Sequence, residues 1–124
     1  WQKQGSKRKQ PFHVCLKHHQ PFAFAGLWES WQSSDGSILE TCTILTTVAN
    51  ELMHPIHDRM PVILPAKIYD DWLDPNQQTS SKLQPLLQPY SSDEMIAYPV
   101  SSAVNRATND SPDCIRPIEE RALN

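Results

Sequence analysis

Three stretches in the first half of the chain have the apolar pattern of β-strands. Each is rich in aromatic or β-branched residues, and they cover residues 11–16 (PFHVCL), 22–28 (FAFAGLW) and 40–47 (ETCTILTT). Polar segments that favour turns separate them, at residues 17–21 and 33–37. Because short turns join neighbouring strands, we predict that the three pair in order as an antiparallel meander.

The pattern becomes helical after the third strand. Residues 48–54 (VANELMH) contain good helix formers, and Thr46 or Thr47 is suited to be the N-cap. Pro55 cannot continue a helix, so it marks the end of the stretch. A short helix is therefore predicted at residues 48–54.

Strands and short helices also alternate in the second half. An apolar strand is predicted at residues 62–64, followed by a helix over residues 65–74 that has a proline in its first turn. The side chains of this helix expected to face the core are Ile68, Trp72 and Leu73. One more short helix is predicted at residues 83–87. Residues 95–101 predict a last strand, in which Pro99 indicates an edge or a bulge.

Several strands with short helices between them predict an α+β fold that is mainly β. We expect a bent antiparallel sheet that forms only a partial barrel, because a sheet without its opening strands keeps an exposed edge. At 124 residues the chain has the size of one domain or of a piece of one. It begins with Trp1 and a polar segment, so we expect it to have been cut from something longer.

The composition predicts a folded, soluble and unexported protein. Hydrophobic residues make up 39% of the chain, too many for a wholly disordered one. No apolar run approaches the roughly 20 residues that span a bilayer, and the N-terminus lacks the apolar part of a signal peptide. The cysteines Cys15, Cys42 and Cys114 match no disulfide or zinc spacing, which fits a reducing compartment, and the first two are expected to be buried.

The charge is unevenly distributed along the chain. The net charge is −3, of which residues 1–19 contribute +5 and the remainder −8. The basic residues of this first stretch are Lys3, Lys7, Arg8, Lys9 and Lys17. A local basic stretch can bind phosphate, although it is equally consistent with a solvated turn over residues 2–10.

Four histidines could indicate a metal-dependent hydrolase. They are His18, His19, His54 and His57. Metallopeptidases need HExxH on one helix face, whereas Pro55 stands between His54 and His57, and no glutamate occupies the required place. A metal hydrolase is therefore only a minor alternative, and no metal or other cofactor is expected.

Three segments together resemble the SOS response-associated peptidase (SRAP) family. They are residues 21–31 (PFAFAGLWESW), 46–64 (TTVANELMHPIHDRMPVIL) and 100–118 (VSSAVNRATNDSPDCIRPI), in which AGLWE, HDRMP and VNxxxND are the specific motifs. The resemblance covers nearly all of this chain but only the later part of the family's domain. It implies that residues 1–124 are the C-terminal portion of a single SRAP domain.

The resemblance implies a specific chemistry on abasic sites in single-stranded DNA. Members of the family carry a cysteine after the initiator Met, and self-processing exposes its α-amine beside its thiol. The two groups capture the aldehyde of the lesion as a thiazolidine, a covalent DNA–protein crosslink. The expected setting is the DNA damage response in the bacterial cytoplasm, with the protein as a monomer.

Four residues of this chain match functional positions of the family. By resemblance, Glu29 of AGLWE and His57 of HDRMP are its acid–base groups, while Arg59 and Thr46 are its phosphate contacts. Glu29 is expected to be partly shielded from water at the end of an aromatic strand, and Thr46 to act beside a helix N-terminus. In isolation, Arg59 fits an ion pair with Asp58 equally well.

The chain departs from the family in lacking the N-terminal cysteine. Cys15, the nearest thiol, has an ordinary peptide nitrogen, so we predict that the chain alone cannot form the crosslink. A non-catalytic module that binds single-stranded DNA, or nothing, remains the main alternative. Trp28 and Trp31 are expected in the core rather than as platforms for base stacking.

Overall fold

The computed structural model describes residues 2–4, 8–76 and 80–118. The chain divides into two compact units, unit 1 (Trp1–Gln20, Ala49–Asp58 and Ser91–Asn124) and unit 2 (Pro21–Val48 and Arg59–Tyr90). In the described residues the strands pair two by two in small antiparallel sheets, with short helices between them and no closed barrel. The predicted α+β, mainly β class is confirmed.

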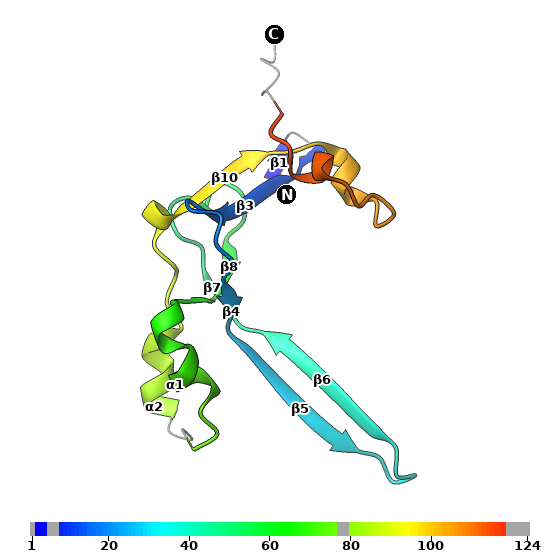
Figure 1. The fold of residues 1–124 in the computed structure, drawn as a ribbon, viewed down its shortest axis with the longest axis vertical. Helices are drawn as coiled ribbons and strands as arrows, with labels where there is room; N and C mark the ends of the chain where they lie inside the picture. The colour runs from blue at the N-terminus through cyan, green and yellow to red at the C-terminus, as the bar shows by residue number, and fades with distance from the viewer. Residues whose placement is uncertain (1, 5–7, 77–79, 119–124) are drawn as a thin grey trace. The chain divides into compact units, whose positions relative to one another are not determined.

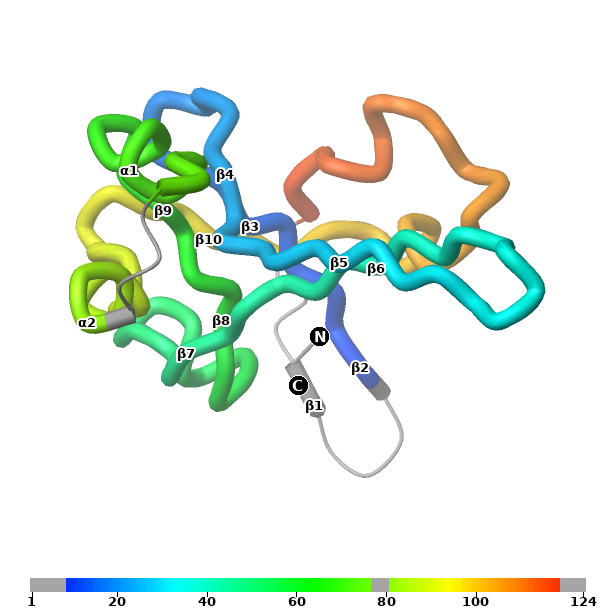
Figure 2. Tube along the Cα trace, turned by 90° about the horizontal axis from the view of Figure 1, so that it is seen from below, coloured from blue at the N-terminus to red at the C-terminus, as the bar shows by residue number. Residues whose placement is uncertain are grey.

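Unit 1 is built around the pairing of two strands distant in sequence. Strand β3 (Phe12–Leu16) runs antiparallel to β10 (Met95–Pro99), and the two lie side by side in Figures 1 and 2. The buried apolar side chains in the described part of unit 1 include Cys15, Met95 and Val100. The remaining elements are β1 (Gln2–Gln4), β2 (Arg8–Gln10), η3 (Ser92–Glu94), η4 (Ser102–Asn105) and η5 (Pro112–Ile115).

Unit 2 contains three strand pairs joined at one point. The pairs are β4 (Ala23–Phe24) with β9 (Ile63–Leu64), β5 (Gly26–Gln32) with β6 (Ile38–Ile44), and β7 (Thr46–Val48) with β8 (Arg59–Pro61). The residues between these strands form a closed cycle of backbone bonds: Ala25 N–H to Val62 O, Val62 N–H to Leu45 O, and Leu45 N–H to Ala25 O, at 2.8 to 2.9 Å. Since Ala25 and Val62 are fully buried, this cycle satisfies backbone groups that water cannot reach.

The described residues of unit 2 also form short helices. They are η1 (Ala66–Ile68), α1 (Tyr69–Leu73), α2 (Ser80–Leu83) and η2 (Gln84–Leu86). Ile68 and Trp72 pack against the core, as predicted, and the Tyr69 hydroxyl accepts a bond from the Ala23 amide at 3.2 Å. Leu73 is 75% exposed, so its predicted place in the core is wrong.

Two predicted elements differ from the structure. The first strand pairs with β10 rather than with the strand that follows it, so only the β5–β6 part of the meander is confirmed. Residues 48–54 are not helical, because Val48 pairs with Arg59 in the β7–β8 ladder and turns follow at residues 51–56. Strand pairing therefore outweighs the local helix preference of this segment.

Strands β5 and β6 form a two-stranded ribbon, visible as the long hairpin in Figure 1, whose side chains are largely exposed. Trp28 and Trp31 are 73% and 58% exposed, and Cys42 is exposed as well, so the predicted burial of these three residues is wrong. The physical reason is the geometry of a hairpin, in which alternate side chains point to opposite faces. Nothing in the described part of unit 2 buries either face.

The turn of this ribbon holds an ionised carboxylate. The Ser37 hydroxyl and the Ser37 amide donate to Asp35 Oδ1 at 2.7 and 2.9 Å, and these bonds hold the pKa of Asp35 below its ordinary value of 3.8. Gly36 adopts the positive φ of 86° that the turn requires.

Replacing Ser37 by Ala is expected to raise the pKa of Asp35, because the hydroxyl bond is the largest cause of its depression. Because the pKa of Asp35 is lower in the folded chain, the ionised carboxylate stabilises the turn at pH values above the ordinary carboxyl pKa. This stabilisation is lost as the pH falls through the pKa of Asp35 in the folded chain. Carboxyl carbon NMR titration of Asp35 measures the shift. Ser34→Ala serves as the control, and an equal shift in both variants would contradict the assignment.

Candidate functional site

Arg59 is held by Thr46 on an exposed face of unit 2. The Nη2 atom of Arg59 donates to both the carbonyl oxygen and the hydroxyl oxygen of Thr46, each at 2.7 Å, and Nε lies 3.3 Å from the hydroxyl. These bonds fix the plane of the guanidinium group. A guanidinium group held in a fixed plane is suited to an anion such as a phosphate.

The register of β7 and β8 explains this pairing. Arg59 of β8 stands opposite Val48 of β7. Thr46 lies two residues before Val48 on β7, so the side chains of Thr46, Val48 and Arg59 share one face. The opposite face carries Met60, which is 1% exposed and anchors β8 in the core. Thr46 therefore acts from a strand, and its predicted place beside a helix N-terminus is wrong.

His57 forms an exposed pair with its neighbour Asp58. Its Nδ1 atom lies 3.0 Å from Asp58 Oδ1, with side chains 60% and 86% exposed. A carboxylate at Nδ1 favours the proton on that nitrogen, which leaves Nε2 as the basic atom of the neutral ring. Asp58 thus partners His57, whereas the guanidinium of Arg59 is directed to Thr46.

A chain of hydrogen bonds links Asn50 to the backbone of His57. Asn50 Oδ1 accepts from the Met53 amide at 3.0 Å, and the Met53 carbonyl accepts from the His57 amide at 2.9 Å. Asn50 Nδ2 also lies 3.3 Å from the sulfur of Met95, a buried residue of β10. The sequence reasoning missed Asn50, although asparagine before a turn is a recognisable signal.

Replacing Asn50 by Ala is expected to loosen the 49–58 loop. The lost side-chain bonds cost about 1 kcal/mol each, so hydrogen exchange at the Met53 and His57 amides should accelerate by about tenfold. Asn76→Ala is the matched control, because the Asn76 side chain bonds only locally, to Asp74 in an exposed turn. Unchanged exchange in Asn50→Ala would exclude the role in positioning His57.

Glu29 lies in the middle of β5, opposite Thr41. Its Oε1 atom accepts from the Ser30 amide at 3.2 Å, and its side chain is exposed. The predicted shielding of this carboxylate from water is therefore absent in this chain. Glu29 shares its ribbon face with Leu27 and Trp31, which have the same parity along the strand.

The structure brings together some of the predicted site residues. Arg59 and Thr46 are in direct contact, and His57 contacts Asp58 rather than another predicted site residue. Glu29 belongs to unit 2 and His57 to unit 1. The predicted approach of these two side chains, on which an acid–base site depends, stays a prediction.

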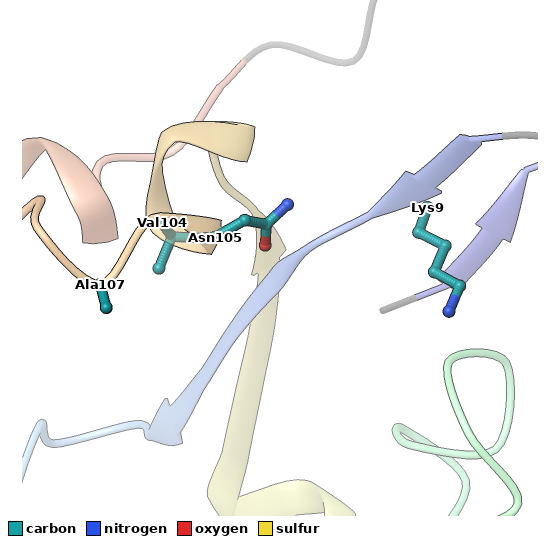
Figure 3. Close-up of a pocket in the computed structure, with 4 residues that line it drawn as sticks. All are labelled: Lys9, Val104, Asn105 and Ala107. Carbon is teal, nitrogen blue, oxygen red and sulfur yellow. The ribbon is translucent and has the colours of Figure 1, made fainter.

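An open hollow is found in unit 1. It is lined by Lys9 of β2 together with Val104, Asn105 and Ala107, as Figure 3 shows. Lys9 is the ionisable side chain among these described lining residues. The other basic residues of the first stretch include Lys7, which lies outside the described residues, as do the side chains of Lys3 and Arg8.

Neither a metal cluster nor a membrane helix is found in the part of the chain that the structure describes. No group of three or more His, Cys, Asp or Glu side chains comes together there in a way that could hold a metal ion. Within the same residues, no helix has the length and apolar character needed to cross a bilayer.

Comparison with known proteins gives consistent matches. "Abasic site processing protein YoqW" of Bacillus subtilis is 50% identical, over 93% of this chain and 51% of that protein. "Abasic site processing protein HMCES" of Gallus gallus is 30% identical, over 96% of this chain and 40% of that protein. A solved protein from Bacteroides thetaiotaomicron superposes with a TM-score of 0.85 at 27% identity, over 96% of this chain and 52% of the other.

The chain spans about half the length of the Bacillus relatives it matches. The family described as SOS response associated peptidase (SRAP) matches residues 1–107, which include the AGLWE and HDRMP motifs and the first residues of the VNxxxND motif. This match confirms the resemblance inferred from those motifs. The chain therefore belongs to the SOS response associated peptidase (SRAP) family.

Proposed function

We propose that the domain to which this chain contributes processes abasic sites in single-stranded DNA and captures them as covalent DNA–protein crosslinks. The observation that carries the proposal is the fixed Arg59 fork, on a chain whose relatives are named abasic site processing proteins. The proposed setting is DNA repair in the bacterial cytoplasm, with a monomeric protein. The names of the relatives support an abasic site as the substrate, and the geometry of Arg59 and Thr46 supports phosphate recognition.

Phosphate recognition is assigned to Arg59 and Thr46. The guanidinium supplies charge-assisted hydrogen bonds to phosphodiester oxygens, and Thr46 holds the fork in place. Both residues lie on the exposed face of the β7–β8 pair. Contacts of this kind position a strand without reading its sequence, which suits a protein that must find a lesion in any sequence.

The proposed crosslinking step needs no added reagent. The α-amine of an N-terminal cysteine attacks the aldehyde carbon of the opened abasic sugar, and the adduct loses one water to give an imine. The cysteine sulfur then bonds to the imine carbon, and the thiol proton passes to nitrogen. A C–N and a C–S bond replace the C=O bond, and no electrons are gained or lost.

Glu29 and His57 are assigned the proton transfers of this reaction. A carboxylic acid can protonate the departing hydroxyl, and the resulting carboxylate can accept a proton from the attacking group. His57, with Asp58 at its Nδ1, is proposed to exchange a proton through Nε2. Together they would supply an acid and a base to the reaction.

The 124-residue chain alone is expected to give no covalent product with abasic single-stranded DNA, because it has no residue that carries both an α-amine and a thiol. The measurement is a denaturing gel after incubation without reductant. The positive control joins the chain to the half of YoqW that lies outside the match, including its N-terminus. A covalent band for the chain alone would refute the assignment of the nucleophile.

A non-catalytic DNA-binding module is the second candidate. It is favoured by the Arg59–Thr46 pair, which is complete within this chain and needs no cysteine. The protein that joins this chain to the other half of YoqW distinguishes the two candidate functions. A catalytic domain forms the covalent crosslink, whereas a binding module binds the oligonucleotide only reversibly.

A further inference from the structure

A thiol and an imidazole meet where strand β3 ends. The Sγ atom of Cys15 lies 3.6 Å from Nδ1 of His19, four residues further along the chain. Cys15 is a buried residue of β3, 9% exposed, whereas His19 is exposed in the turn region that follows. Neither residue has a part in the proposed handling of DNA. The pair is a separate group of two atoms that can bind a metal ion.

The backbone of the turn carries the imidazole back to the strand. Leu16 stands opposite Met95, and the Lys17 amide donates to the Glu94 carbonyl at 2.9 Å, so the chain stays held to its partner segment as far as Lys17. The His19 amide then donates to the Leu16 carbonyl at 2.9 Å. His19 has a φ of 51°, in the left-handed region that glycine adopts with less strain. A glycine here would make the turn but would supply no imidazole.

The distance between the two atoms matches one edge of a tetrahedral metal site. Zinc binds thiolate sulfur at about 2.3 Å and imidazole nitrogen at about 2.0 to 2.1 Å, so a regular tetrahedron has an S···N edge of about 3.5 to 3.6 Å. A linear arrangement of the same bonds would need about 4.3 to 4.4 Å. The 3.6 Å between Cys15 and His19 therefore fits a tetrahedral ion. In the metal-free chain the contact is a hydrogen bond, whose direction depends on the tautomer of His19.

Two protein ligands leave two positions of the tetrahedron open. In the part of the chain that the structure describes, no third His, Cys, Asp or Glu side chain joins this pair to form a larger metal-binding group. Water can fill the open positions, because His19 is exposed. Such a site binds zinc more weakly than a structural site with four protein ligands.

We propose that Cys15 Sγ and His19 Nδ1 form a two-ligand site for a zinc ion whose coordination is completed by water. The Cys15 thiol releases its proton to water as the sulfur bonds to the metal, and no electrons are gained or lost. The neutral imidazole binds through Nδ1 and keeps its proton on Nε2. The ion ties the turn to buried strand β3, so it stabilises the folded chain by mass action. The proposal is independent of the crosslinking reaction.

The first test replaces zinc by Co²⁺, because a cobalt–thiolate bond gives a charge-transfer band in the near ultraviolet. We expect a 1:1 complex with this band. Cys15→Ser should remove the band, and His19→Gln should weaken Co²⁺ binding by at least tenfold. His18→Gln and Cys42→Ser are the matched controls, since each removes the same type of side chain outside the pair, and both should bind Co²⁺ as the parent chain does.

The second test uses the chain without substitution, so a variant that fails to fold cannot affect it. Zinc should slow the alkylation of Cys15 by iodoacetamide at least fivefold, while Cys42 and Cys114 react at unchanged rates, as measured by mass spectrometry of peptides. Equal protection of the three cysteines would overturn the proposal. So would the absence of the band at millimolar Co²⁺, its loss in either control variant, or unchanged Co²⁺ binding by His19→Gln.

Discussion

Replacing Glu29 by Gln is expected to slow crosslink formation by about 10²- to 10⁴-fold, the usual contribution of a positioned acid–base group. The variant is made in the protein that joins this chain to the half of YoqW that lies outside the match. Glutamine keeps the size of the side chain but cannot exchange a proton, so DNA binding should persist. The rate is measured as the appearance of the covalent band with abasic single-stranded DNA.

The ribbon offers a matched control for Glu29. Glu40 lies on the opposite face, paired with Ser30, so Glu40→Gln removes the same charge one register position away on the neighbouring strand without touching the proposed site. Its crosslinking rate should remain within a factor of two or three of the parent. Equal slowing by both variants would show that net charge, rather than proton transfer by Glu29, controls the reaction.

Replacing Arg59 by Ala is expected to weaken binding of single-stranded DNA by about ten- to a hundredfold. A charge-assisted hydrogen bond contributes about 1.5 to 3 kcal/mol, and each 1.4 kcal/mol corresponds to about a factor of ten. Loss of one phosphate contact should also reduce the slope of log affinity against log salt by about 0.7. Fluorescence anisotropy with a labelled oligonucleotide, across a salt series, measures both quantities.

Two further variants separate the effect of the charge of Arg59 from the effect of its side-chain geometry. Arg59→Lys keeps the charge but loses the planar fork, so it should recover the salt slope and only part of the affinity. Arg116→Ala is the control, because Arg116 is an exposed arginine paired with Asp113 outside the proposed site. An affinity loss in Arg116→Ala as large as that in Arg59→Ala would indicate a general charge effect.

Local patterns predicted the elements whose partners are near in sequence. The β5–β6 hairpin follows from two strand-like runs joined by a polar turn, and the helix near Trp72 follows from its proline and its apolar spacing. The pairing of β3 with β10 joins residues about eighty positions apart. Periodicity within a short window carries no information about so distant a partner.

The wrong predictions around the site also have physical causes that a short stretch of sequence does not reveal. Residues 48–54 have helix-forming composition, yet Val48 gains a ladder partner in Arg59, and Asn50 organises turns instead. The alternation of Phe22, Phe24 and Trp28 predicts a core position for Trp28 and Trp31, but a two-stranded ribbon cannot bury its own faces. The motifs identified the family, whereas the surroundings of each side chain required the structure.

The bonds between Arg59 and Thr46 have a consequence for the thermodynamics of recognition. A free arginine side chain carries about 2 kcal/mol of rotamer entropy, which is normally lost when it grips a ligand. Here the Thr46 carbonyl and hydroxyl oxygens already restrict those rotamers in the unliganded protein. Part of the ordering cost is thus met during folding, so an arriving anion encounters a preorganised receptor and not a mobile one.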